Sequence, residues 1–310
     1  MCDIWKANQN RQELSPADLE PHIAAIRKLN VRQIVLSGGE ALLHSNLWAF
    51  CAPLKAEGIS LTLLSSGLLL ERHAESIVRW CDEVIVSLDG SPAIHDSIRN
   101  IPHAFDRLAA GVSALRKADP EYRVKGRCVL QRLNFHDLPG IIDTAHQVGL
   151  NQISFLAADV SSGAFNRPIP WDGERAFTIA LDSGELERFR VVVEEVIANY
   201  PAEFLSGFIA ESPEKLRSIR EYFSAILDTA SFPHQPCNAP WVSAVIEADG
   251  AVKPCFFHPA FGNLEDSRLD NVLNSKQAVA FRRKLDVDTD PICQRCVCRL
   301  NFNPLHSLPG

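Results

Sequence analysis

The sequence predicts an α/β fold with a parallel sheet, followed by a small cysteine-rich C-terminal domain. From residue 33 onward, a strand–loop–helix alternation repeats five times, which is typical of consecutive βα units with right-handed crossovers. Each expected strand stops at a polar or glycine-rich loop, the rim where α/β barrels keep their chemistry. Five of the nine cysteines follow residue 232, among short segments and turns. Such a region buries little apolar surface, so we expect a metal to stabilise it.

The expected elements follow from hydrophobic periodicity. Strands are expected over residues 33–36, 59–64, 83–88, 123–131 and 152–157, and helices near 46–57, 70–80, 104–117, 137–148, 185–199 and 214–227. Ser15-Pro16-Ala17-Asp18 has a capping residue, a proline at the first helical position and an acidic first turn, so a helix should begin there.

Composition narrows the class of protein. A chain of 310 residues with 46% hydrophobic and 22% charged residues is an ordinary globular protein. Its net charge of −7 argues against nucleic acid as a partner. The longest apolar run, near 61–70, is too short for a membrane span, and no signal peptide is visible. We expect a cytoplasmic protein without a membrane partner, in which cysteines are metal ligands or buried thiols.

The stretch Leu36-Ser37-Gly38-Gly39-Glu40 ends the first expected strand. Gly38 and Gly39 permit positive φ and let a ligand approach bare backbone. Glu40 then places a carboxylate at the strand's C-terminal end. Alone, this is an ordinary turn. It gains meaning from Cys2 upstream, the βα repeat after it and the cysteines at the far end of the chain.

Together these features resemble the radical S-adenosylmethionine (radical SAM) enzymes that carry a C-terminal SPASM/twitch auxiliary iron–sulfur domain. The resemblance implies a partial (β/α)6 TIM-like barrel that lacks its first strand, over residues 1–200. A helical bridge would cover 201–232, and a SPASM/twitch domain 233–310.

The resemblance also implies a set of SAM-binding residues. Val86-Ser87-Leu88-Asp89-Gly90, followed by His95-Asp96 and Arg99, matches the family pattern, in which Ser87 and Arg99 would hold the SAM carboxylate. Gly38, Gly39 and Glu40 would receive the methionyl ammonium. Ser66 lies in Ser65-Ser66-Gly67, where relatives carry Thr-Asn-Gly, and Gln131 would contact the ribose or cap its loop. Ala41 stands where the family often has proline.

Cys2 resembles the last cysteine of the family signature C-x3-C-x-Φ-C, which binds the SAM-site 4Fe-4S cluster. Its two partners would fall upstream of Met1, so we expect a start assigned too late or a truncated chain. The chain as given cannot complete that cluster, because one thiolate does not make a three-cysteine site. The alternative is a terminal thiol without a role.

The C-terminal cysteines have a spacing of their own. Cys237, Gly250 and Cys255 give C-x12-G-x4-C, and Cys293 and Cys296 give C-x2-C. This resembles the twitch domain, whose four cysteines ligate one auxiliary 4Fe-4S cluster. A structural zinc is the rival, although zinc ribbons usually have two C-x2-C knuckles. The role of Cys298 stays open.

The other polar and thiol candidates are less specific. Asp89 and Asp159 end strands and are the candidate catalytic, substrate-facing residues, with solvated loop residues as the alternative. Cys51, Cys81 and Cys128 lie within helix or strand patterns, which predicts buried, unreactive thiols.

The family chemistry is reductive cleavage of SAM to a 5′-deoxyadenosyl radical, which abstracts hydrogen from a substrate. We therefore expect a radical SAM oxidoreductase or maturase with a flavodoxin or ferredoxin as reductant, acting on a peptide or a small molecule such as a sugar alcohol. An auxiliary cluster would exchange an electron or anchor substrate. From a different class, a non-catalytic iron–sulfur carrier, a zinc-stabilised binding protein or an inactive fragment remains as the alternative.

Overall fold

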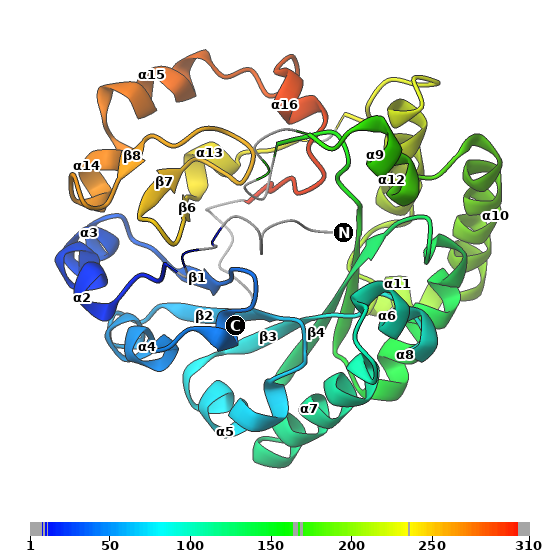
Figure 1. Ribbon diagram of the computed structural model, residues 1–310, viewed down its shortest axis with the longest axis horizontal. Coiled ribbons are helices and arrows are strands. Elements are labelled where there is room, and N and C mark those ends of the chain that lie inside the picture. Colours follow the sequence, from blue (N-terminus) through cyan, green and yellow to red (C-terminus); the bar gives the residue numbers. More distant parts are fainter. Residues whose placement is uncertain are drawn as a thin grey trace. The chain divides into compact units, whose positions relative to one another are not determined.

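The computed structural model describes residues 8, 10, 12–163, 167, 170–234 and 236–302 (Figure 1). These residues form two compact units. The first contains residues 32–160 and 172–231, and the second contains the described residues before 32, between 161 and 171, and after 231. Residues 201–231, expected as a bridge, thus lie within the first unit, and residues 12–31 belong to the second. The three-part domain division stays a prediction.

The first unit is built on a parallel sheet whose strands follow chain order. The strands are β1 (Gln33–Leu36), β2 (Ser60–Ser65), β3 (Glu83–Ser87), β4 (Arg123–Leu130) and β5 (Gln152–Ala157). Beyond β5, an isolated parallel bridge joins Ile153 to Ile209, with the N–H of Ile153 donating to the carbonyl of Phe208 at 2.7 Å. The predicted α/β fold with five parallel strands is confirmed.

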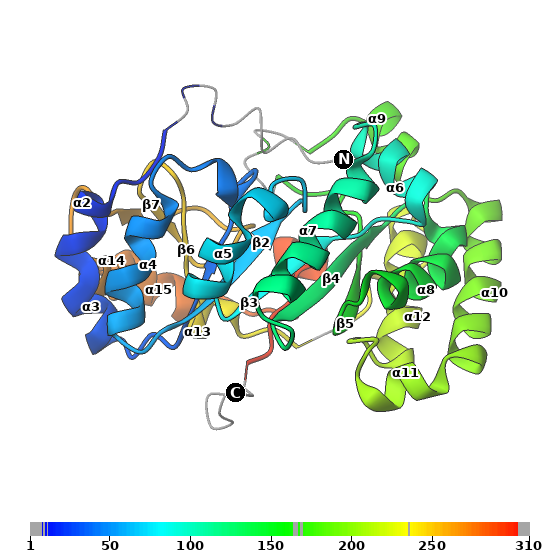
Figure 2. The same ribbon diagram turned by 90° about the horizontal axis from the view of Figure 1, so that it is seen from below.

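Helices cover one side of this sheet, as Figure 2 shows for α4, α5, α7 and α8. The long helices are α4 (Leu47–Ala56), α5 (Leu70–Trp80), α6 (Pro92–Arg99), α7 (Ala104–Ala118), α8 (Leu138–Val148), α10 (Ser183–Asn199) and α12 (Pro213–Ile226). Shorter pieces are η2 (Ala41–Leu43), η3 (Phe135–Asp137), α9 (Gly173–Ile179) and α11 (Pro201–Ser206). The expected helices are confirmed to within two residues at each end, whereas α6 was not expected.

The two faces of the sheet differ in polarity. One face is apolar and fully buried, with Leu61, Leu63, Val84, Val86 and Val124 all at 0% exposure. On the alternate positions, polar side chains connect neighbouring strands. Thr62 Oγ1 accepts from Gln33 Nε2 at 2.8 Å and donates to Glu83 Oε1 at 3.2 Å. Glu83 in turn pairs with Lys125 at 2.7 Å. This second face is the polar interior that a partial barrel presents.

The second unit has little regular structure. Its antiparallel sheet has the order β6 (Val245–Ile246), β7 (Ala251–Lys253) and β8 (Gly262–Asn263), with helices α13 (Ala239–Val242), α14 (Leu269–Leu273), α15 (Lys276–Lys284) and α16 (Pro291–Gln294). The N-terminal elements α2 (Pro16–Leu19), η1 (Glu20–His22) and α3 (Ile23–Lys28) belong to this unit.

Two polar contacts join the N-terminal helices to α14. The N–H of Leu269 donates to His22 Nδ1 at 3.2 Å, and Lys28 pairs with Asp270 at 2.9 Å. The helix expected after Ser15 is confirmed, with the capping box formed between Ser15 and Asp18. Helices far apart in sequence therefore pack as one unit.

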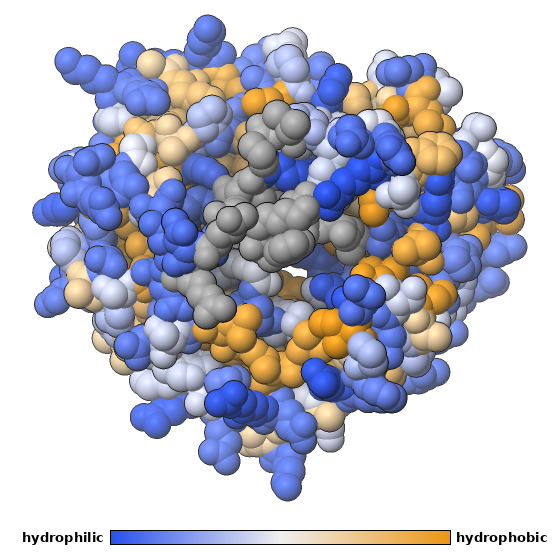
Figure 3. Space-filling view, in the orientation of Figure 1, coloured by the Kyte–Doolittle hydropathy of each residue, from blue (hydrophilic) through white to orange (hydrophobic). Residues whose placement is uncertain are grey.

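The surface carries no broad apolar face in the view of Figure 3, where hydrophilic side chains predominate and hydrophobic ones form separate clusters. Among the described residues, no helix combines the length and the hydropathy that crossing a membrane requires.

Candidate functional site

The turn after β1 has the geometry that its glycines predict. Gly38 has φ +135°, a conformation that L side chains rarely adopt. A Cβ placed at Gly38 or Gly39 would meet no atom within 4 Å, so the backbone here is open to a ligand. Only a residue without a side chain keeps both the turn and this access.

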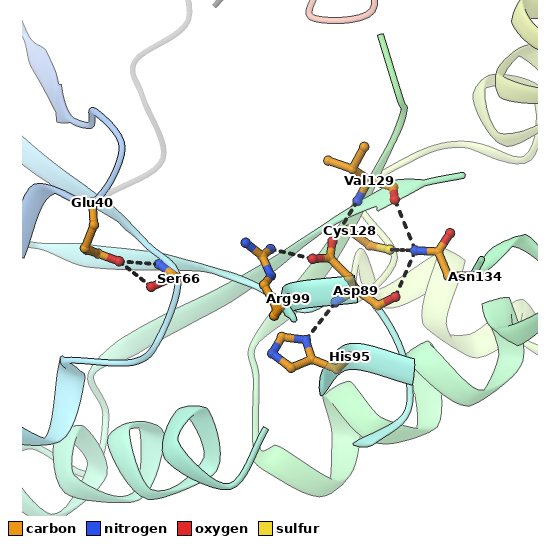
Figure 4. A network of polar contacts seen from close by, with 8 residues as sticks. All are labelled: Glu40, Ser66, Asp89, His95, Arg99, Cys128, Val129 and Asn134. Atoms are coloured by element: carbon orange, nitrogen blue, oxygen red, sulfur yellow. Dashed lines mark hydrogen bonds and ion pairs between the residues drawn. The ribbon is translucent and has the colours of Figure 1, made fainter. Parts of the chain in front are cut away.

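Glu40 ties the ends of β1 and β2 together (Figure 4). Its Oε1 accepts from the N–H of Leu42 at 3.3 Å, which caps η2. Its Oε2 accepts from the N–H of Ser66 at 2.7 Å, from the Ser66 hydroxyl and from the Ser65 hydroxyl at 3.2 Å. These four donors occupy the roughly four hydrogen-bond acceptor sites of a carboxylate. Because serine hydroxyls rotate freely, an ammonium group can replace them without moving the backbone.

Asp89 is the centre of a second polar network, at the end of β3. Its carboxylate is 0% exposed, pairs with Arg99 Nη2 at 2.5 Å and accepts from the N–H of Val129 at 3.3 Å. Its own N–H donates to His95 Nδ1 at 3.2 Å. The carboxylate predicted to face substrate is therefore enclosed, and it orients Arg99 from helix α6 (Figure 4).

His95 is a neutral imidazole in this network. Burial, followed by the nearby charge of Arg99, lowers the pKa of His95 to about 4. With Nδ1 accepting from Asp89, the ring proton is assigned to Nε2. The His95 ring is buried and meets Phe105 edge to face at 6.2 Å.

Unsatisfied polar atoms gather at the same strand ends. Among the described residues, three buried side-chain atoms at these strand ends have no hydrogen-bond partner: His95 Nε2, Arg99 Nε and Gln131 Oε1. Buried polar atoms are normally satisfied, so such a concentration calls for an explanation such as a polar ligand. Donors and acceptors of this kind fit the carboxylate and ribose of SAM.

Asn134 fixes the position of Gln131. Its Nδ2 donates to the carbonyls of Asp89 at 2.8 Å and Val129 at 3.1 Å, and its Oδ1 accepts from the N–H of Gln131 at 2.8 Å. Gln131 is 1% exposed and directly follows β4. Ser87 is half-buried as the last residue of β3.

The remaining predicted residues of the first unit are also placed. Asp159 follows β5 and is buried, at 8% exposure. Cys51, Cys81 and Cys128 are buried at 3% exposure or less, as predicted for thiols that pack as small hydrophobes. Cys2 lies outside the described residues.

The second unit contains a cavity of about 140 Å³ lined by cysteines. Cys237, Cys255, Cys293 and Cys296 all line it, and Cys298 joins them. The rest of the lining is mainly apolar and includes Pro240, Phe256 and Leu300. Thiols from segments up to 61 residues apart in the sequence thus converge on one space.

The electrostatics of these thiols favour a bound cation. Burial raises the pKa of Cys296, and the neighbouring thiols of Cys298, Cys255 and Cys237 raise it further. Burial and then Asp290 raise the pKa of Cys293 to about 12. Because several thiolates so close together repel one another, a metal or cluster is the group that makes them stable together.

Hydrogen-bond donors already point at these sulfurs. Burial raises the pKa of Cys255, while the N–H groups of Phe257 and His258 lower it by hydrogen bonding. His258 Nε2 lies 3.3 Å from Cys293 Sγ. Burial lowers the pKa of His258, which keeps its ring neutral, with one N–H to donate. Four cysteine sulfurs supported by N–H donors fit a 4Fe-4S cluster.

Local structure explains the spacing of the cysteines. Gly250, with φ +79°, makes the turn between β6 and β7, and a Cβ there would lie 2.6 Å from Asn263 Oδ1. Asp290 caps α16 by accepting from the N–H of Cys293 at 3.0 Å. The proximity of His258 to Cys293 was not predicted. The His258 position three residues after Cys255 was its one visible signal.

Two family models match the chain. The Radical SAM superfamily matches residues 1–145, and SPASM, an iron–sulfur cluster-binding domain, matches residues 237–297. The two domains define a class of protein whose cofactors are SAM and 4Fe-4S clusters. Residues 1–145 therefore match the radical SAM superfamily and residues 237–297 match the SPASM domain, which confirms the resemblance seen in the sequence.

Curated relatives match part of this chain. An AdoMet-dependent heme synthase of Methanosarcina barkeri is 26% identical over 140 residues, 44% of this chain and 40% of the relative. A pre-heme d1 synthase of Dinoroseobacter shibae is 26% identical over 168 residues, 54% and 41% of the two chains. A GTP 3',8-cyclase of Xanthomonas campestris pv. campestris is 34% identical over 125 residues, 39% and 37%. The matched region spans about two fifths of each relative.

Solved structures share the fold over most of the chain. anSMEcpe with bound AdoMet superposes with a TM-score of 0.60 at 16% identity, covering 86% of this chain and 74% of that one. SuiB of Streptococcus suis bound to precursor peptide SuiA superposes with a TM-score of 0.62 at 13% identity, covering 96% and 68%. At these identities the likeness establishes the fold.

Proposed function

We propose that the protein is a radical SAM oxidoreductase or maturase that uses an auxiliary cluster in its second unit. The bound cofactors would supply a 5′-deoxyadenosyl radical that abstracts hydrogen from a peptide or small-molecule substrate. The observation that carries this proposal is the pairing of two sites in one chain: an open glycine turn with Glu40, and a cavity lined by the predicted cysteines.

In this proposal the first unit binds the methionyl group and the ribose of SAM. The backbone at Gly38 and Gly39 and the carboxylate of Glu40 receive the methionyl ammonium. Arg99 and Ser87 hold the methionyl carboxylate, and Gln131 contacts the ribose. The unpartnered Arg99 Nε and Gln131 Oε1 supply polar atoms for these roles. Asp89 acts by positioning Arg99, because its carboxylate is enclosed and paired.

The second unit would hold the auxiliary cluster through Cys237, Cys255, Cys293 and Cys296. Cys298 lines the same cavity and is the candidate replacement ligand. Asp159, at the end of β5, remains the candidate for substrate contact in the first unit. A flavodoxin or ferredoxin would supply electrons.

The substrate remains at the level of a class. The names of the relatives refer to heme, heme d1 and GTP chemistry, whereas one structural neighbour holds a precursor peptide. These are properties of those proteins, and they support both substrate classes for this chain.

SAM binding and cleavage test the proposal. In calorimetry on the cluster-reconstituted protein, Glu40→Gln should weaken SAM binding about 10-fold or more, since a charge-assisted hydrogen bond contributes ~1.5–3 kcal/mol. Glu75→Gln, an exposed site in the same unit, is the matched control and should bind as the wild type does. Cleavage under dithionite should be measured on this chain and on a form extended by the upstream codons of the parent gene.

Two outcomes would contradict the proposal. Equal SAM affinity of Glu40→Gln and wild type would remove Glu40 from the site. Failure of both forms to bind SAM, with zinc as the only metal retained, would favour the zinc-stabilised binding protein instead.

A further inference from the structure

Helix α15 (Lys276–Lys284) presents a basic face to solvent. Lys276, Arg283 and Lys284 are exposed and separated by seven and eight residues, so they lie on one side of the helix. With Asn274, Val279 and Ala280 they line an open hollow of about 550 Å³. We call these three cations and the hollow between them the α15 basic face.

The three cations are not neutralised locally. Over the described part of the chain, no carboxylate forms an ion pair with Lys276, Arg283 or Lys284, whereas Lys28 and Lys253 of the same unit pair at 2.9 and 2.8 Å. Two carboxylates that follow α15 are engaged by other partners. Asp286 Oδ2 accepts from the Thr289 hydroxyl at 2.9 Å, and Asp288 pairs with His234 at 2.7 Å.

The opposite side of α15 leads to the cysteine cavity. Phe281 packs edge to face on His258, with ring centroids 5.0 Å apart. His258 Nε2 lies 3.3 Å from Cys293 Sγ. Among the described residues, helix α15 therefore has cations outside any ion pair on its outer side. On its inner side, Phe281 contacts His258 edge to face, and His258 reaches a cysteine of the proposed cluster. Figure 1 shows α15 at the edge of its unit.

We propose that the α15 basic face is the docking surface for an acidic one-electron carrier protein, which reduces the auxiliary cluster. The carrier gives up one electron and is oxidised, the cluster gains it and is reduced, and no bond is made or broken. This inference rests on the proposed function. The net charge of −7 would repel an acidic carrier elsewhere, so a local basic face gives both steering and orientation.

Binding is the first test, because it does not require a working cluster. Reduced and oxidised flavodoxin, an acidic carrier, serve as probes against the immobilised chain at low and high salt. Lys276→Glu/Arg283→Glu/Lys284→Glu should weaken binding about 10-fold at low salt, and salt should weaken wild-type binding similarly. Arg72→Glu/Arg107→Glu/Lys117→Glu changes net charge equally at exposed sites of the first unit, and it should retain binding within about threefold.

Electron transfer is the second test. In stopped-flow reduction by flavodoxin, the α15 triple variant should lose about 10-fold in rate at low salt, whereas its reduction by dithionite should match the wild type. Failure of dithionite to reduce any form would contradict the proposed function and leave the binding result to decide on docking.

Three results would overturn the docking proposal. Equal losses of flavodoxin affinity in the two triple variants would show that net charge, and not the α15 basic face, causes the effect. Unchanged flavodoxin binding by the α15 variant would place the contact elsewhere. Tight binding of heparin to the α15 basic face, with no flavodoxin binding, would make it a polyanion surface instead.

Discussion

The two units of this chain reach stability by different routes. The twelve largest fully buried side chains of the described residues all lie in the first unit, among them Phe155, Leu61 and Leu63. The second unit has strands of two or three residues, smaller buried side chains such as Ile26, Val252 and Ala278, and a cavity lined by cysteines. We expect apolar burial to stabilise the first unit and a bound metal to contribute to the stability of the second. Fold and cofactor dependence are therefore separable within one chain.

Removing a cysteine ligand should have the largest effect, confined to the second unit. Cys255→Ser should lose most of the bound iron and most of the amide hydrogen-exchange protection of residues 236–302, because metal-binding free energy is folding free energy there. Cys51→Ala removes a buried thiol of the first unit and should keep the iron. If iron-free Cys255→Ser kept full amide protection in the second unit, that unit would not depend on a metal for its stability.

A cavity in the sheet core should have the next largest effect, in the first unit. Leu63 is 0% exposed, so Leu63→Ala should lower the free energy of unfolding by about 2–5 kcal/mol in urea titrations. Leu205 is 92% exposed, and Leu205→Ala should change the free energy of unfolding by less than ~0.5 kcal/mol. Equal effects of the two substitutions would show that the sheet is not the main core. Iron content should stay unchanged in both variants.

Acid should destabilise the first unit through His95. Its folded pKa of about 4 lies below the ordinary 6.5, so above pH 6.5 both states are neutral. As the pH falls from 6.5 to 4, the His95 imidazole is protonated in the unfolded chain but stays neutral in the folded chain. This difference lowers the free energy of unfolding by up to ~3 kcal/mol. His95→Asn, which keeps an acceptor for the Asp89 N–H, should flatten this acid limb in urea titrations. His136→Asn, at an exposed site, should not. An unchanged limb in His95→Asn would remove His95 as its cause.

The smallest predicted effect is on the potential of the auxiliary cluster. An N–H donor at Cys293 stabilises the more negative, reduced cluster, so His258→Phe should lower its midpoint potential by about 50 mV. His258→Gln, which can present an amide N–H at a similar place, should restore most of it. Potentiometric EPR titration measures both. Identical midpoint potentials in His258→Phe and His258→Gln would show that His258 acts only by packing beside the cluster.

Sequence reasoning succeeded where the signal is local. The alternation in residues 152–157 predicted β5, because side chains there alternate between a helix-covered and a polar face. The Gly38 turn and the Ser15 capping box were equally local. By contrast, the sequence after Asp89-Gly90 resembles a turn, and helix α6 was not predicted there. Only the structure shows that α6 places Arg99 beside Asp89.

Contacts between distant segments could not be predicted in this way. His258 and Cys293 are 35 residues apart, and Lys28 and Asp270 are 242 apart. Nothing in either local pattern specifies such partners. The cysteine spacing predicted a shared site only because C-x12-G-x4-C followed by C-x2-C resembles the twitch domain, whose four cysteines bind one cluster. The motif thus indicated which residues meet, and the structure adds the donors that support them.

Metal and sulfide analysis after anaerobic reconstitution tests the central claim most directly. We expect about four irons and four sulfides per chain in the second unit, with an EPR signal after dithionite reduction that Cys255→Ser abolishes. A chain that retains only zinc, or whose iron is unaffected by Cys255→Ser, would contradict the assignment of the cysteine cavity as an iron–sulfur site.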